Sequence, residues 1–297
     1  MTQGETEARA ATAPIAQIAQ IARIDALSTH HDPVHEGVRV RWRRFGTDTA
    51  QPPIVLLHGG HGSWMHWLRN AEALSAGRTL WLPDMPGFNE SDALPRVAPG
   101  EDTLPPLLAA LGGTLDQLVG ADTPIDLGGF SFGGLTAARF AVQRGAVRRF
   151  ALVGSGGHGT MRRMTAQMIN WRAAPDREAE RAALLNNLAA LMLHDKAAID
   201  ALAFEIHDIS CHGTRFRSKE VSQSGGLRQA LDVLGARGVA TLLLWGEFDV
   251  TADPRPLVAQ LVAEGPGREG TVVDGAGHWA QYERADEVNA RLLRFFS

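Results

Sequence analysis

The chain of 297 residues has a single cysteine, Cys211, so no disulfide can form within it. This favours a reducing compartment, and we expect a cytoplasmic protein. No run of apolar residues reaches the roughly 18 that a membrane-spanning helix requires. Near the N-terminus, Glu5 and Glu7 stand where a signal peptide needs positive charge, so the sequence does not support secretion.

An excess of positive charge is also missing. The 29 Lys and Arg residues face 33 Asp and Glu residues, which gives a formal net charge of −4. We therefore expect a small-molecule substrate as the partner, with no nucleic acid and no membrane. No nucleotide or flavin motif is present. His58, His61 and His66 lie in a glycine-rich stretch without spaced carboxylates or cysteines, so we predict no metal and no cofactor.

Short apolar runs alternate with Ala- and Leu-rich segments of helical length from about residue 34 onward. Continuous apolar runs, typical of strands buried on both faces, occur in 53–60, 78–87, 124–131, 148–157, 240–249 and 270–278. Residues 38–45 alternate in the manner of a half-exposed strand at a sheet edge. This rhythm predicts an α/β fold with a mostly parallel central sheet and helices on both faces.

The alternation is interrupted once, by residues 156–236, which contain amphipathic pieces and no convincing strand. We interpret them as an inserted helical cap above the carboxyl ends of the strands, where α/β folds bind ligands. The core then comprises 34–155 and 237–297, and 1–33 form an N-terminal extension. In that extension Ile15, Ile18, Ile21 and Ile24 can form a short helical stripe, although a frayed or loosely docked segment is the favoured interpretation.

The stretch DLGGFSFGGL, residues 126–135, contains the motif Gly-x-Ser-x-Gly around Ser131. It follows a predicted buried strand and precedes a predicted helix. A serine on such a sharp turn needs small residues two positions away on each side, and Gly129 and Gly133 stand there. The turn exposes the hydroxyl above the sheet and leaves the amide of Phe132 at a helix N-terminus. We predict that Ser131 is a nucleophile.

A serine hydroxyl needs a base, and the base needs a third group that fixes its tautomer. Among 11 histidines, His278 follows the last predicted strand in a glycine-bearing loop, so we favour it as the base. Asp249 and Glu247 follow the preceding strand. We favour Asp249 as the acid because it gives the chain order Ser, Asp, His, while Glu247 remains the alternative.

Two backbone amides are candidates for an oxyanion hole. One is that of Phe132. The other is that of Gly60, in the glycine-rich stretch LLHGGHGSW (56–64) after the first buried strand. A phosphate-binding loop is the rival interpretation, but no Lys-Ser or Lys-Thr pair follows these glycines.

Several segments together resemble the α/β-hydrolase superfamily: LHGGHG (57–62), LPDMPGFNESD (82–92), GFSFGG (129–134), WGEFD (245–249) and GAGHWAQYERADEVNARLLRFF (275–296). The resemblance covers nearly everything from residue 36. Within the superfamily, DMPGFNESD, VGSGG and GHWAQYERADEVN are most similar to the meta-cleavage-product hydrolases, which hydrolyse a C–C bond in vinylogous 1,5-diketones. The resemblance implies a triad of Ser131, Asp249 and His278, an oxyanion hole of Gly60 and Phe132, and Trp279 in the substrate pocket.

The chain departs from that group at recognition positions. Phe130 stands where the C–C hydrolases have asparagine, and the segment HGSWMHW (61–67) lacks their longer glycine- and proline-containing loop. The segment ALAFEIHDI (201–209) lacks their cap arginine, although Arg215 and Arg217 follow. We take Gly59, Phe130, Trp279, Arg215 and Arg217 as substrate-binding candidates, with solvated arginines as the alternative for the last two.

Loss of polar recognition groups favours a less polar acyl group. We therefore expect a serine hydrolase that acts through an acyl-serine on a small, largely apolar carboxylic ester or related acyl substrate. A C–C hydrolase of the meta-cleavage-product type is the alternative. A ligand-binding protein of the same fold with an idle triad is a third hypothesis, from a different class. Related enzymes are often dimers or larger, so the oligomeric state is left open and a homodimer is one alternative.

Overall fold

Eight strands form the central sheet of the computed structural model, which describes residues 15–95, 97–98, 101–223 and 225–297. Their order across the sheet is β1 (Thr29–His31), β4 (Trp42–Phe45), β6 (Leu80–Pro83), β5 (Ile54–Leu57), β7 (Ile125–Phe130), β8 (Val147–Val153), β9 (Ala240–Gly246) and β10 (Arg268–Val273). Neighbouring strands are parallel from β6 to β10, while β4 is antiparallel to both β6 and β1. The predicted α/β fold with a mostly parallel sheet is confirmed.

The edge of the sheet differs from the sequence expectation. Residues 38–45 were expected to form an edge strand, but they contain β3 (Val38–Arg39), which pairs with β2 (Val34–His35) in a separate hairpin, and β4. β1 pairs with the outer side of β4, so Trp42 and Phe45 are buried. The sheet therefore begins inside the segment that we expected to be an extension, because residues 29–31 supply its outermost strand.

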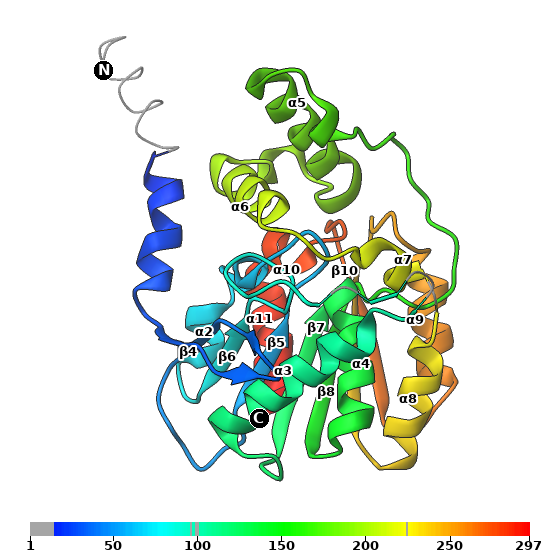
Figure 1. The fold of residues 1–297 in the computed structure, drawn as a ribbon. Coiled ribbons are helices and arrows are strands. Elements are labelled where there is room, and N and C mark those ends of the chain that lie inside the picture. The colour runs from blue at the N-terminus through cyan, green and yellow to red at the C-terminus, as the bar shows by residue number, and fades with distance from the viewer. Residues whose placement is uncertain (1–14, 96, 99–100, 224) are drawn as a thin grey trace, which may run out of the picture.

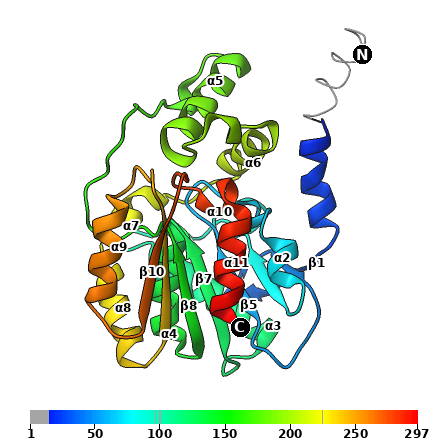
Figure 2. The same cartoon turned by 180° about the vertical axis from the view of Figure 1, so that it is seen from behind.

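Helices cover both faces of the sheet (Figures 1 and 2). One face is packed by α3 (Leu104–Val119), α4 (Phe132–Arg144), α8 (Leu227–Ala236) and α9 (Pro254–Ala263), whose apolar side chains belong to one cluster. The other is packed by α2 (Ala71–Ser75) and α11 (Ala285–Phe296). Between them the strands β5, β6 and β9 are almost continuously apolar, as burial on both faces requires.

A helical cap lies above the carboxyl ends of the parallel strands (Figure 1). It contains the short helices η2 (Trp171–Ala173) and η4 (Lys196–Ala198), helix α5 (Arg177–Asn187), the π-helical turn η3 (Leu188–Met192) and helix α6 (Ala201–His212), with α7 (Ser218–Gln223) closer to the sheet. We expected the cap to run to residue 236. However, Leu227, Leu231 and Leu234 of α8 are buried in the cluster that contains α4, so we assign α8 to the core.

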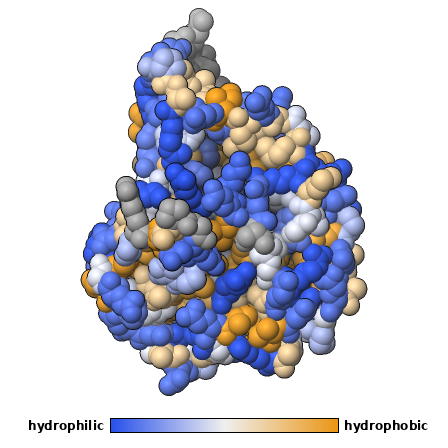
Figure 3. Space-filling model, turned by 45° about the vertical axis from the view of Figure 1, so that its right-hand side comes forward, coloured by the Kyte–Doolittle hydropathy of each residue, from blue (hydrophilic) through white to orange (hydrophobic). Residues whose placement is uncertain are grey.

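Residues 15–25 form a helix that rises beside the cap (Figure 1). Its lower end is docked, because Ile24 is buried and Ile21 packs against the same cluster as α11, whereas Ile15 and Ile18 are exposed. Hydrophilic residues cover most of the face shown in Figure 3, with apolar residues scattered among them. Within the described residues, no helix is both long enough and apolar enough to span a membrane.

Candidate active site

Ser131 stands on the turn that joins β7 to α4, with φ of +55° and ψ of −120°. This is a strained conformation for a residue with a side chain. Its N–H donates to the carbonyl of Val153 on β8 at 3.0 Å, which fixes the turn to the sheet. The flanking glycines are required by packing: a Cβ on Gly129 would lie 2.2 Å from the carbonyl oxygen of Gly133, and one on Gly133 would lie 2.1 Å from that of His58.

The hydroxyl of Ser131 lies at one end of a chain of hydrogen bonds. Nε2 of His278 is 2.9 Å from Oγ of Ser131, and Nδ1 of His278 is 2.8 Å from Oδ2 of Asp249. His278 and Asp249 are both buried. Because a carboxylate only accepts, this network assigns the ring proton to Nδ1 and leaves Nε2 free to accept from the serine.

Asp249 is held ionised by its neighbours. Its Oδ1 accepts hydrogen bonds from the N–H and the Oγ1 of Thr251, at 2.8 and 2.7 Å. Burial acts to raise the pKa of Asp249, but His278 and Thr251 outweigh it, so the pKa lies below the ordinary 3.8. Glu247, the alternative acid, instead accepts from the amide of Gly275 and from Arg255.

The two amides expected to bind an oxyanion lie near Ser131. Phe132 is the first residue of α4, and the first N–H groups of a helix have no acceptor within it. Gly60 lies on the adjacent loop, where a Cβ would be 3.6 Å from Cβ of Phe132 and 2.4 Å from Oγ of Ser218. Neither amide has an acceptor in the part of the chain that the structure describes.

Buried histidines hold the loop that contains Gly60. Nε2 of His58 accepts from the amide of Met85 at 2.9 Å, and Nδ1 of His66 accepts from the amide of Gly59 at 3.1 Å. Burial lowers the pKa of His58 to about 4 and that of His66 well below 6.5, so both rings are neutral at pH 7. Over residues 15–95, 97–98, 101–223 and 225–297, no group of three His, Cys, Asp or Glu side chains is arranged to hold a metal ion.

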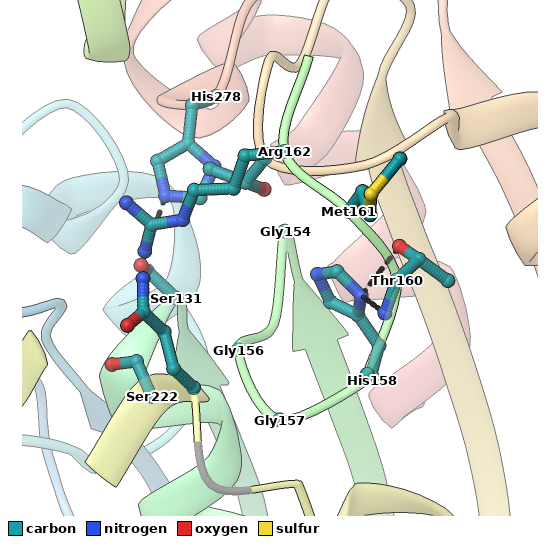
Figure 4. Close-up of a pocket in the computed structure, with 13 residues that line it drawn as sticks. Ser131, Gly154, Gly156, Gly157, His158, Thr160, Met161, Arg162, Ser222 and His278 are labelled. Atoms are coloured by element: carbon teal, nitrogen blue, oxygen red, sulfur yellow. Dashed lines mark hydrogen bonds between the residues drawn. The ribbon is translucent and has the colours of Figure 1, made fainter. Parts of the chain in front are cut away.

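Two cavities meet at Ser131 and His278, with volumes of about 420 and 200 Å³. The larger is lined mainly by the loop that follows β8 (Figure 4). The smaller lies on the side of the oxyanion amides. Its lining comprises Gly60, His61, Phe130, Phe132, Arg162, Met168, Leu191, Met192, Ser218, Lys219 and Ser222 in addition to Ser131 and His278.

The charged side chains of these cavities are cationic. Arg162 lines both cavities, and Figure 4 shows it with His278 above Ser131. Lys219 lines the smaller cavity, and no Asp or Glu lines either of them among the described residues. The neighbouring Arg163 is paired with Asp253 at 2.9 Å, whereas no ion pair is formed by Arg162 within the described chain. The cavities are therefore suited to a ligand that carries negative charge.

The expected substrate-binding residues are only partly in these cavities. Phe130 lines the smaller one, but Gly59 lies behind it, where a Cβ would be 2.9 Å from the Phe130 ring. Trp279 is fully buried, and its Nε1 donates to the carbonyl of His66 at 3.0 Å, so it supports the loop from beneath. The indole therefore lies outside the substrate pocket, where it was expected.

The two cap arginines also lie outside the cavities. Arg215 donates to the carbonyls of Asn89 and Ser91 and so ties the cap to the loop after β6. Arg217 is exposed and lines neither cavity. The sequence did not single out Arg162 and Lys219, because Arg162 lies in an irregular segment and Lys219 on the short helix α7, where no pattern indicates which residues face the serine.

The comparisons with known proteins agree with this geometry. The alpha/beta hydrolase fold family matches residues 52–285. The chain belongs to this family. It is an enzyme of the hydrolase class, as the strand-to-helix turn at Ser131 indicated.

Among curated relatives, the 2-hydroxy-6-oxo-6-phenylhexa-2,4-dienoate hydrolase of Burkholderia cepacia is 30% identical over 260 residues, 82% of this chain and 87% of the relative. This confirms the resemblance to the C–C hydrolases. The dihydrolipoyllysine-residue acetyltransferase component of the acetoin cleaving system of Pseudomonas putida is 32% identical over 267 residues, 87% of this chain and 67% of the relative. Naproxen esterase from Bacillus subtilis shares the fold, with a TM-score of 0.73, 20% identity and coverage of 95% of this chain and 98% of that one.

Proposed function

We propose that this enzyme is a serine hydrolase that cleaves a small carboxylic ester or related acyl substrate through an acyl-serine. The single observation that carries the proposal is the continuous series of hydrogen bonds from Ser131 through His278 to Asp249, at 2.9 and 2.8 Å. Distances in this range allow proton transfer between a nucleophile and its base.

The chemistry follows from these positions. Nε2 of His278 takes the hydroxyl proton of Ser131 while Oγ attacks the acyl carbon, and Asp249 stabilises the imidazolium that forms. The amides of Gly60 and Phe132 donate to the oxyanion. The C–O bond to the leaving group then breaks, and His278 returns the proton to the departing alkoxide. His278 then takes a proton from water, and the resulting hydroxide attacks the acyl-serine. The bond between the acyl carbon and Oγ breaks, His278 returns the proton to Oγ, and the acid is released.

The cavity lining supports an acyl group with an apolar body and a charged end. Phe130, Phe132, Met168, Leu191 and Met192 supply apolar surface beside the oxyanion amides. Arg162 and Lys219 supply positive charge, and no carboxylate lines the cavity among the described residues. A substrate that bears a carboxylate away from the scissile carbonyl would satisfy both features.

A second candidate is hydrolysis of a C–C bond in a vinylogous diketone, and the Burkholderia relative named as a dienoate hydrolase favours it. The same three side chains serve that reaction, since the diketone carbonyl takes the place of the ester. Against it, Phe130 is apolar and precedes the nucleophile, so it offers no hydrogen bond to a polar dienol.

The two candidates are separated by a substrate panel. The enzyme and its S131A variant are incubated with p-nitrophenyl esters, with an ester that bears a terminal carboxylate, and with a coloured dienol diketone acid. We expect Ser131-dependent turnover of the esters to be the faster reaction. Consumption of the dienol faster by orders of magnitude would make the C–C hydrolase the function. No turnover of any substrate would favour the binding-protein hypothesis.

A further inference from the structure

The carboxylate of Glu283 at the end of α10 (Ala280–Glu283) accepts three backbone hydrogen bonds that the chemistry above does not use. Its Oε1 accepts from the amides of His194 and Asp195 in the cap, at 2.8 and 2.7 Å. Its Oε2 accepts from the amide of Gly277 at 2.5 Å. One side chain thus joins a cap segment to the residue that immediately precedes His278.

The same cap segment, residues 192–195, contacts the loop of His278 at two further points. The amide of Trp279 donates to the carbonyl of Met192 at 2.8 Å. Gly277 approaches the segment so closely that a Cβ there would lie 2.7 Å from the nitrogen of His194. Of the two neighbours of His278 in the sequence, Trp279 is therefore hydrogen-bonded to the cap and Gly277 is packed against it.

The loop of the acid is also touched by this segment. The ring of His194 stacks on Phe248, with centroids 3.6 Å apart and planes within 12°. Phe248 immediately precedes Asp249, and its amide donates to the carbonyl of Ala276 at 2.8 Å. Segment 192–195 thus lies against both loops that supply partners to Ser131.

The chemistry of the side chain at 283 explains why a carboxylate is needed. Both oxygens of a carboxylate accept hydrogen bonds, so one can face the cap amides while the other faces Gly277. The amide of glutamine has one acceptor oxygen, and its other end is an NH2 group that only donates. A glutamine would therefore turn an N–H toward one of the two sets of backbone N–H groups.

We propose that Glu283 is a positioning residue that couples the cap to the triad, because it locks residues 192–195 against both neighbours of His278 and so holds the imidazole in line with Ser131. The proposal rests on the proposed function, in which His278 is the base. It implies that the cap does more than enclose the substrate. The cap must be packed against the loop of His278 for the imidazole to face Ser131.

The test uses the full chain, four single variants and the double variant of E283Q and D195P. E283Q removes the two-sided acceptor. D195P removes one cap donor, and φ of −75° at Asp195 is compatible with proline. D195N is its matched control, since it keeps the amide and an oxygen that can cap Ala197. E287Q is the control for loss of a glutamate, because the one ion pair of Glu287 within the described residues is with Arg291 on the next turn of α11.

We expect E283Q to lower kcat for an ester, and the rate constant of labelling by a small fluorophosphonate, by about 10- to 100-fold, because a displacement of about 1 Å at a reacting group has that effect. KM should change less than about threefold. D195P should lower the same constants by a smaller factor, and the double variant should be no slower than E283Q alone. D195N and E287Q should match the wild type.

Three results would overturn the proposal. These are an E283Q variant as fast as the wild type, a rise in KM with kcat unchanged, and losses in E283Q and D195P that multiply in the double variant. The last would show that Glu283 does not act through the cap segment.

Amide hydrogen exchange provides a readout that is independent of activity. E283Q should accelerate exchange in 192–195 and 277–279 together, with exchange in β7 unchanged. Acceleration in only one segment, or in neither, contradicts the proposal that Glu283 couples the cap to the loop of His278. If the folded wild type is not labelled at all, the proposed function is wrong, and the exchange result alone then decides whether Glu283 joins the cap to this loop.

Discussion

Nε2 of His278 lies 2.9 Å from Oγ of Ser131, although 147 positions separate the two residues in the chain. Each of the three side chains is positioned differently: Ser131 by a strained turn, Asp249 by Thr251, and His278 by a loop that is hydrogen-bonded to Met192 of the cap and to Glu283. Disturbing each arrangement separately should therefore affect the chemistry in a different way.

The turn at Ser131 depends on the absence of a side chain at Gly133. In G133A the new Cβ would lie 2.1 Å from the carbonyl oxygen of His58 and 2.7 Å from that of Leu57, so the backbone at the end of β5 must move. We expect a loss of more than about 3 kcal/mol in the free energy of unfolding, measured by chemical denaturation, together with slow labelling of Ser131. G77A is the control, since nothing lies within 4 Å of its Cβ. A G133A variant as stable and as reactive as G77A would contradict the packing described.

Thr251 should affect the rate of the reaction and not the binding of substrate. T251V keeps the shape and the backbone N–H but removes the Oγ1 donor 2.7 Å from Oδ1 of Asp249. A buried hydrogen bond to a charged group contributes about 1.5–3 kcal/mol, so we expect kcat to fall about tenfold or more with little change in KM. T241V, at a buried threonine near the start of β9, should leave kcat unchanged. Equal kcat values in T251V and T241V would show that Thr251 does not assist Asp249.

The charge of Arg162 should decide which esters are preferred. In R162Q we expect kcat/KM for an ester with a terminal carboxylate to fall about tenfold, as loss of an ionic hydrogen bond implies, while an uncharged ester of the same length changes less than about twofold. R163Q is the matched control, because Arg163 is paired with Asp253. If R162Q slows both esters equally, Arg162 shapes the cavity without recognising charge.

His58 should make the protein less stable in mild acid. Burial lowers its pKa from 6.5 to about 4, so the unfolded chain takes up a proton between these values while the folded chain does not. Above pH 6.5 the ring is neutral in both states and does not affect the free energy of unfolding. As the pH falls toward 4, protonation of the unfolded chain lowers that free energy. From this ring alone we expect a loss of about 3 kcal/mol, measured as the difference between wild type and H58Q in urea unfolding at pH 7.5 and pH 4. Parallel pH profiles for the two proteins would contradict it.

The residues that short motifs place at strand ends could be predicted from the sequence. Ser131, Asp249 and His278 each follow an apolar run that ends at the same edge of the sheet, so topology alone brings them near one another. Arg162 could not be found in this way, because it lies in an irregular segment whose path depends on the cap. The resemblance to the C–C hydrolases implied that Trp279 lies in the pocket, but its indole is fully buried and donates to the carbonyl of His66.

The boundaries of the fold were hidden for similar reasons. β1 has only three residues, too few for a periodic pattern, and its strand pairing with β4 defines it. α8 is amphipathic like the cap helices, and only its contact with α4 shows that its apolar side faces the core. Sequence periodicity indicates that an apolar face exists, whereas packing determines which surface it covers.

The central claim is that Ser131 is activated by His278, and mass spectrometry of the protein after treatment with a fluorophosphonate tests it most directly. We expect one adduct per chain, mapped to the peptide that contains Ser131, absent in S131A and slower by about a thousandfold or more in H278A. An unmodified folded wild-type protein, or an adduct on another residue, would contradict the account.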